Sequence, residues 1–135
     1  MTTVTLTPAG DNNVVDMIEG EAQTFTCTTD SSSPPAMIQW YIGGHNVTNQ
    51  ATPQQPQQDG DQFISSSSLV YTGRDVDHNK FIFCEAVNIE GRQKSKSSEK
   101  SIFIKCEFIY NIIYIFIYVY IYIYNVIARY STDKV

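Results

Sequence analysis

The sequence predicts an all-β fold, a sandwich of two sheets over residues 1–105, followed by a segment of different character over residues 106–135. Three observations predict this fold. Cys27, Trp40 and Cys84 follow one another at wide spacing. The runs around them alternate apolar and polar residues over the length of a strand, and polar turns separate these runs. No segment before residue 105 repeats its apolar residues with the period of a helix, so the class is all-β.

Two cysteines with a tryptophan between them, inside about 100 residues and about seven to eight short strands, are the pattern of an immunoglobulin-like Greek-key sandwich. In that pattern a disulfide joins facing strands and the indole fills the space beside it. A bridge between Cys27 and Cys84 closes a loop of roughly 58 residues, worth about 4 kcal/mol in the chain-entropy account. The alternative, two unrelated buried thiols, is disfavoured because the strand patterns on both sides keep one register. Cys106 is left over.

The first strands are expected at an edge of the sandwich. Residues 3–7 alternate threonine with apolar side chains, and Pro8 ends this run where a missing backbone donor costs least. Residues 11–13 turn the chain, and residues 14–18 resume the edge. Gly20 provides the corner before the strand that carries the first cysteine.

The strand around Trp40 is expected to be half-buried, with Ile38 and Ile42 on the same inner face as the indole. Gly43 and Gly44 close it with a tight turn. Residues 49–62 are rich in Gln, Pro, Asp and Gly and have almost nothing to bury. We therefore expect a mobile connection with little regular structure.

The second half continues the alternation. Residues 65–72 form a strand, residues 74–77 form the corner before the second cysteine, and residues 89–91 form a hairpin turn that leads into one last strand over residues 95–105. The side chains expected to point inward from these strands are Leu69, Tyr71, Ile82, Cys84, Ala86, Ile102 and Ile104.

Strand parity also predicts an exposed aromatic face. If Trp40, Cys84 and Ile102 point into the sandwich, their neighbours on the same strands point out, on one and the same sheet. Such a patch usually marks an interface for another protein, and we expect Phe83 near its centre because this residue lies on the middle strand of the three. The alternatives are that a neighbouring domain or the connection over residues 49–62 covers the face, or that a bulge changes the register. The aromatic residues in question are Tyr41, Phe81, Phe83 and Phe103.

The cysteine pattern places the domain in an oxidising compartment, hence in a secreted or cell-surface protein. There, Asn46-Val47-Thr48 is an acceptor triplet for N-glycosylation at Asn46. The first ten residues have neither the basic start nor the apolar run of a signal peptide. We therefore expect the chain to be a fragment of a longer receptor whose leader lies upstream.

Several local motifs carry a family resemblance: Gly20 seven residues before Cys27, WYIGG from the core tryptophan onward, LVYTGRDVD, and CEAVN with its following glycine. On these motifs, residues 3–105 resemble an immunoglobulin-like domain of nephrin and related cell-adhesion receptors. Many such domains carry a tyrosine two residues before the second cysteine, where this chain has Ile82. The departure disfavours a variable-type domain and fits the constant-type or intermediate domains of adhesion receptors, in which a corner acid, here Asp77, precedes an apolar residue.

The segment 106–135 changes composition abruptly to isoleucine and tyrosine, without proline or glycine. One interpretation is a transmembrane helix over residues 109–128, with Arg129 and Lys134 on the cytoplasmic side; Asn111 and Asn125 and the central tyrosines argue against it. A second is a long β-strand, which would be an aggregation hazard. The third, which we favour, is that an AT-dinucleotide repeat has been read in frame past an exon, because ATA and TAT encode Ile and Tyr.

Chemistry of other kinds finds little support. A net charge of −5 with scattered basic residues gives no footprint for nucleic acid. His45 and His78 lack the spacing of a metal or catalytic site, and Asp75 and Asp77 read as carboxylates of a solvated turn. We expect no cofactor, no metal and no enzyme activity.

The predicted function is that of an extracellular protein-binding module of a cell-surface adhesion or recognition receptor. Its partner would be another cell-surface protein or a second copy of itself. The alternatives are a soluble secreted immune-type binding protein and a translation product without function. A genuine membrane anchor after residue 105 would distinguish the cell-surface receptor from the secreted binding protein.

Overall fold

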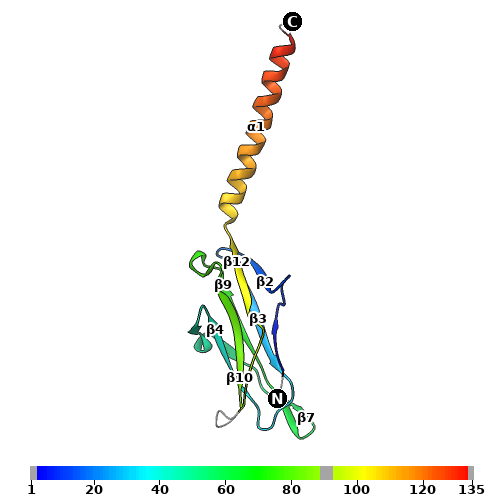
Figure 1. Cartoon of the computed structure of the whole chain (residues 1–135), viewed down its shortest axis with the longest axis vertical. Helices are drawn as coiled ribbons and strands as arrows, with labels where there is room; N and C mark the ends of the chain where they lie inside the picture. The colour runs from blue at the N-terminus through cyan, green and yellow to red at the C-terminus, as the bar shows by residue number, and fades with distance from the viewer. Residues whose placement is uncertain (1–2, 89–92, 134–135) are drawn as a thin grey trace. The chain divides into compact units, whose positions relative to one another are not determined.

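The structure is a computed structural model that describes residues 3–88 and 93–133, and the chain divides into two compact units, Met1–Lys105 and Cys106–Val135 (Figure 1). The first unit is built from strands in two main sheets that pack face to face, with two short 3-10 helices in the connections. The prediction of an all-β sandwich of two sheets is confirmed.

One sheet has four antiparallel strands in the order β1-β3-β9-β6. Its two long members form because their sequences alternate: on β3 the positions of Phe25, Cys27 and Thr29 are buried, and the positions between them are more exposed. The bounds of the strands are Val4–Thr7 for β1, Ala22–Thr29 for β3, Ser66–Thr72 for β9 and Thr52–Pro53 for β6.

The other sheet has the strand order β2-β12-β10-β4-β5, and β11 pairs with β10 outside this path. In Figure 1, β10 and β12 run side by side through this sheet. Cross-strand pairs between β10 and β4 place Cys84 opposite Trp40 and Phe83 opposite Tyr41. The bounds are Val14–Ile18 for β2, Lys100–Lys105 for β12, Phe81–Val87 for β10, Met37–Ile42 for β4, His45–Asn46 for β5 and Lys94–Lys96 for β11.

The chain changes sheets between β1 and β2, which was not predicted. β1 pairs with β3 in the four-stranded sheet, whereas β2 runs parallel to β12 in the other sheet. The crossing requires glycine at Gly10, whose φ is +66° and where a Cβ atom would lie 2.1 Å from the carbonyl oxygen of Val14. Asn13, also at positive φ, accepts a 2.7 Å hydrogen bond from the buried Lys100 ammonium. Val14–Ile18 therefore forms an edge of the second sheet.

The expectation of little regular structure over residues 49–62 was wrong. A 3-10 helix at Thr48–Gln50 leads into β6, which pairs with β9, and a small hairpin follows. That hairpin is made of β7, Gln57–Asp59, and β8, Gln62–Ile64. The backbone pairing of Ser32 with Phe63 holds it to the loop after β3. Short polar strands of this kind satisfy backbone groups without burying side chains, so their alternation is too weak to predict.

The single last strand predicted over residues 95–105 is divided into β11 and β12. The interruption contains Ser97, whose backbone N–H donates to the carbonyl of Cys84 at 2.9 Å and whose hydroxyl accepts from the Cys84 N–H at 3.0 Å. The serine thus satisfies both backbone groups of Cys84 at a bulged position. The hairpin turn predicted at residues 89–91 lies outside the described residues.

The core lies between the two main sheets. Phe25, Trp40, Leu69, Ile82 and Ile102 are its largest fully buried apolar side chains, and the other inward residues expected from strand parity join them. Ile38 and Ile104 lie at the margin and are half-buried. The corner before β10 is a second 3-10 helix, Asp75–Asp77.

The second unit contains one helix, α1, Glu107–Asp133. The β-strand interpretation of this segment was therefore wrong. Within α1, Asn111–Thr132 is long and apolar enough to cross a membrane, and its side chains are almost all exposed. The interpretation as read-through of an AT repeat concerns the transcript and stays a prediction.

Candidate functional site

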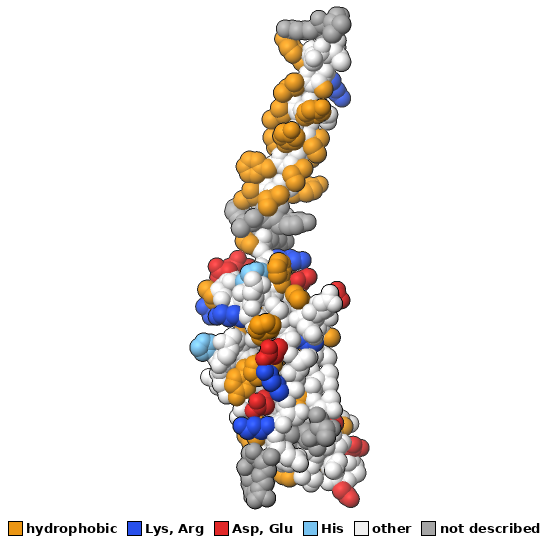
Figure 2. Space-filling view, in the orientation of Figure 1, with side chains coloured by type: hydrophobic (Ala, Val, Ile, Leu, Met, Phe, Trp, Pro, Cys, Tyr) orange, Lys and Arg blue, Asp and Glu red, His pale blue; other side chains and the backbone are white. Residues whose placement is uncertain are grey.

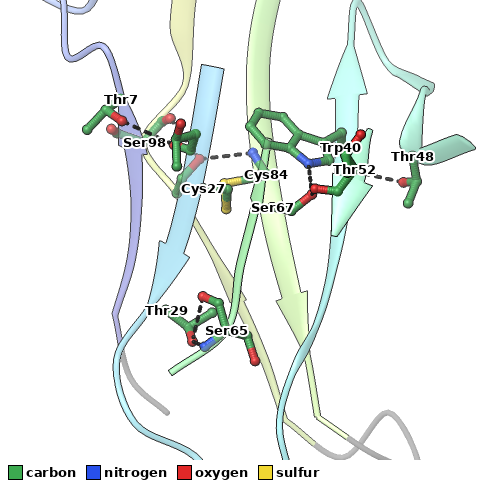
Figure 3. Close-up of a disulfide and its surroundings, with 12 residues drawn as sticks. Thr7, Cys27, Thr29, Trp40, Thr48, Thr52, Ser65, Ser67, Cys84 and Ser98 are labelled. Atoms are coloured by element: carbon green, nitrogen blue, oxygen red, sulfur yellow. Dashed lines mark hydrogen bonds between the residues drawn. A yellow bond between two sulfur atoms is a disulfide. The ribbon is translucent and has the colours of Figure 1, made fainter. Parts of the chain in front are cut away.

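The two bridge cysteines and the tryptophan form the centre of the domain. Cys27 on β3 and Cys84 on β10 are joined by a disulfide that links the two sheets, with a Cα–Cα distance of 6.4 Å. The indole of Trp40 is fully buried, and its Nε1 donates a 3.0 Å hydrogen bond to the hydroxyl of Ser67 (Figure 3). The predicted disulfide is confirmed; the free thiol is Cys106.

A buried tyrosine on β9, Tyr71, makes the hydrogen bonds at the corner before β10. Ile82 is fully buried at the position where many related domains have tyrosine. Tyr71 instead donates its phenol hydrogen to Asp77 and accepts from the backbone N–H of Arg74 at 3.3 Å. Burial, together with the hydrogen bond to the carboxylate, raises the pKa of Tyr71 to about 12. The sequence placed Tyr71 inward but gave no sign of this contact.

Asp77 is therefore not the carboxylate of a solvated turn that we expected. Only 13% of its side chain is exposed, and it accepts hydrogen bonds from both Tyr71 and the ammonium of Lys80. A hydroxyl group and an ammonium group satisfy its two oxygens, which is how a mostly buried carboxylate is tolerated. The acid has a structural role in pinning the corner between β9 and β10.

Four aromatic side chains point outward from the larger sheet. Tyr41 and Phe83 are half-buried and stack on each other across β4 and β10, with ring centroids 5.0 Å apart. Phe81, two residues along β10, is 51% exposed, and Phe103 on β12 is 39% exposed. Because Phe81 lies opposite Ser101, Phe103 is its diagonal neighbour on this face. β10 lies between β12 and β4, so the two phenylalanines of β10 occupy the middle strand. We call these four side chains the aromatic face.

Charged side chains surround the aromatic face. The ammonium of Lys96 lies 4.0 Å from the centre of the Phe83 ring, a cation–π contact. Glu85 forms an ion pair with Lys94 at one end, and Lys105 forms one with Asp16 at 3.6 Å. Figure 2 shows hydrophobic, acidic and basic side chains close together over the domain. An apolar centre with a charged rim is the usual anatomy of a protein interface.

The glycosylation triplet lies on the strand next to this face. Asn46 is exposed on β5, directly opposite Tyr41 in the antiparallel register, and directly opposed residues point to the same side of a sheet. Its side-chain oxygen accepts hydrogen bonds from the N–H of Thr48 at 3.0 Å and from the Thr48 hydroxyl at 2.6 Å. That hydroxyl in turn accepts from the backbone N–H of Trp40 at 2.9 Å.

The two histidines have no catalytic geometry within the described residues. His45 is exposed on β5, and His78 accepts a hydrogen bond from the N–H of Ile104 while its ring meets Phe103 edge-on. In residues 3–88 and 93–133, no group of three or more His, Cys, Asp or Glu side chains has the arrangement of a metal site.

Comparison with known proteins identifies a matching domain family and a relative among cell adhesion molecules. The sequence profile of the CD80-like C2-set immunoglobulin domain matches residues 5–95. Cell adhesion molecule 2 of Xenopus tropicalis is 32% identical over 68 residues, which are 50% of this chain and 16% of that relative. The chain thus spans about a sixth of the length of the curated relative it matches.

Solved structures share the fold. Rst D1-D2 matches with a TM-score of 0.64 and 25% identity over 76% of this chain and 48% of that chain. The mouse nectin-like molecule 4 ectodomain matches with a TM-score of 0.58 and 16% identity, over 76% of this chain and 32% of that chain. The fourth constant domain of nurse shark IgNAR matches with a TM-score of 0.51 and 16% identity, over 73% of this chain and 91% of that chain. Because the sequence profile matches residues 5–95, which make up most of the sandwich, the chain belongs to the CD80-like C2-set immunoglobulin domain family.

Proposed function

We propose that the sandwich is an extracellular protein-binding module of an adhesion or recognition receptor, and that the aromatic face is its contact surface. The observation that carries this proposal is the exposure of Phe81 and Phe103 on one sheet, beside the stacked pair Tyr41 and Phe83. Exposed aromatic clusters with a charged rim are uncommon on isolated soluble domains and common at interfaces. Binding, without catalysis, is the activity that this surface supports.

The relatives support the adhesion role. Cell adhesion molecule 2 is, by its name, an adhesion protein, and the matched structure of nectin-like molecule 4 is that of its ectodomain. By analogy the partner is another cell-surface protein or a second copy of this chain. The glycosylation triplet at Asn46 agrees with a secretory route, and a glycan there would stand beside Tyr41 at the edge of the contact surface.

Attachment to the membrane belongs to the same proposal. The helix Asn111–Thr132 has the length and composition of a single-pass anchor, and Arg129 lies near its end, as expected for the cytoplasmic side. With this anchor the module is displayed on a cell. The second candidate is a secreted binding protein of the same fold, in which the aromatic face would serve in the same way.

Substitution on the face tests the proposal. Beads coated with the Phe81→Ser chain should bind beads that carry the wild-type chain, or a panel of immunoglobulin-type ectodomains, about tenfold more weakly than wild-type beads do, because the most exposed aromatic side chain of the face is lost. Val70→Ser is the matched control: Val70 is 60% exposed but lies on β9, in the opposite sheet. Equal weakening by both variants, or by neither, would exclude this face as the contact surface.

A further inference from the structure

Polar side chains of α1 gather along one face. At 3.6 residues per turn, each residue advances about 100° around the helix. On this count an arc of about 80° holds both asparagines and the arginine of the candidate span, together with three of its tyrosines. Tyr120 and Tyr124 fall on the opposite side. The members of this polar stripe are Asn111, Tyr114, Tyr118, Tyr122, Asn125 and Arg129.

The two asparagine side chains of the stripe are open to a partner. Asn111 and Asn125 are exposed, and neither carboxamide forms a hydrogen bond with the residues whose side chains the structure describes, which are 3–88, 93–106 and 111–132. Thr132, by contrast, donates its hydroxyl back to the helix carbonyls of Ala128 and Arg129. In hydrocarbon, a carboxamide without a partner is costly, and such residues face a protein neighbour. The asparagines that argued against a membrane span would fit one if this face were covered.

We propose that α1 self-associates in the membrane as a parallel pair, with the polar stripe of one copy against that of the second. The inference rests on the proposed membrane anchoring. Two copies in one membrane carry their sandwiches on the same side, so their helices run parallel and equal positions meet. A carboxamide is both donor and acceptor, so Asn111 pairs with Asn111 of a second copy and Asn125 with Asn125.

The spacing of the stripe supports this register. Asn111, Tyr118 and Asn125 are separated by seven residues each, the repeat that keeps one seam facing a partner helix. Figure 2 shows hydrophobic side chains along the visible face of α1. The other positions of the helix are mainly exposed isoleucine, valine and aromatic residues, which would face the lipid tails. A second copy is the occupant because its Asn111 and Asn125 carry self-complementary carboxamides at the same levels, whereas Arg129 lies near the end of the span and extends its guanidinium to the membrane surface.

Energy transfer in vesicles tests the pairing. The full chain, labelled with donor or acceptor at Cys106, the cysteine outside the disulfide, is reconstituted into phosphatidylcholine vesicles. Wild-type chains should show transfer above random mixing. Asn111→Leu with Asn125→Leu should weaken dimerisation about tenfold. A matched pair refines the result: Tyr118→Phe with Tyr122→Phe should lower transfer, whereas Tyr120→Phe with Tyr124→Phe should leave it unchanged.

Vesicle flotation separates the two possible failures. Chains that do not float with the vesicles would contradict the anchoring and, with it, the pairing. Chains that float but show only random transfer would overturn the pairing alone. Equal loss of transfer in the two tyrosine pairs, or full transfer without the asparagines, would show that the polar stripe is not the interface.

Discussion

At the scale of single residues, Thr48 connects the modification site to the core. Its hydroxyl accepts the backbone N–H of Trp40 and donates to the side-chain oxygen of Asn46. One side chain therefore serves both the acceptor triplet for glycosylation and the strand that carries the core tryptophan. A change at this position that removes the hydroxyl affects two properties together.

Substitutions separate these properties. Thr48→Val should lower the free energy of unfolding by about 1 kcal/mol, because the N–H of Trp40 loses its acceptor, and should abolish any glycan at Asn46. Asn46→Gln should abolish the glycan while it keeps the contact with Trp40, and Thr48→Ser should retain both. Chemical denaturation of deglycosylated protein measures the stability, and mass spectrometry of the secreted chain measures the glycan. Equal stability of the Val and Ser variants would contradict the role given to the hydroxyl.

Tyr71 makes the stability of the domain depend on alkaline pH. Its pKa is raised from 10 to about 12 by burial and by its hydrogen bond to Asp77, so the neutral phenol is favoured in the folded state. This stabilisation is complete below the unfolded-state pKa near 10 and is lost as the pH rises from 10 to 12. A shift of about two units corresponds to roughly 2–3 kcal/mol.

The test compares wild type with Tyr71→Phe by denaturation at pH 8, 10 and 11.5. The difference in unfolding free energy between the two proteins should shrink over this range, because phenylalanine has no proton to lose while the other tyrosines titrate equally in both. A difference that stays constant from pH 8 to 11.5 would show that the Tyr71 phenol is not held in its neutral form by the fold.

At the scale of elements, the crossing between the sheets depends on Gly10. Gly10→Ala should destabilise the domain by more than about 2 kcal/mol, because the positive φ is strained and the new Cβ would meet the Val14 carbonyl. Gly44→Ala is the control: Gly44 also has positive φ, but a Cβ there would meet no atom within 4 Å. Thermal melts should rank wild type, Gly44→Ala and Gly10→Ala in falling order. A reversed order of the two variants would contradict the steric argument.

The sequence predicts correctly those features that depend on the alternation of apolar and polar residues along a strand. The inner faces of the strands around Trp40, Leu69 and Cys84, and the outward parity of the aromatic face, follow from period two alone. Sheet membership does not follow, because Val14–Ile18 alternates in the same way whichever sheet it joins. The bulge at Ser97 and the contact between Tyr71 and Asp77 depend on hydrogen bonds between distant residues, which leave no periodic signal.

At the scale of the whole molecule, the sandwich carries its own core. Every buried apolar side chain among the described residues belongs to the first unit, and β12, Lys100–Lys105, completes that unit by pairing with both β2 and β10. α1 contributes no buried residue within the part of the chain that the structure describes. Stability should therefore reside in residues 1–105.

Truncation tests this expectation. A fragment of residues 1–105 should melt cooperatively within about 4 °C of the full chain in detergent, because a larger shift would correspond to about 1 kcal/mol or more for a domain of this size. A fragment of residues 1–99 is the control and should not fold, because it lacks β12 and thereby leaves β2 without its parallel partner and the pocket of Ile102 empty. If the longer fragment also failed to fold, residues 106–135 would be part of the domain rather than a separate unit. If the fragment of residues 1–105 folds and still binds through the aromatic face, binding does not depend on α1.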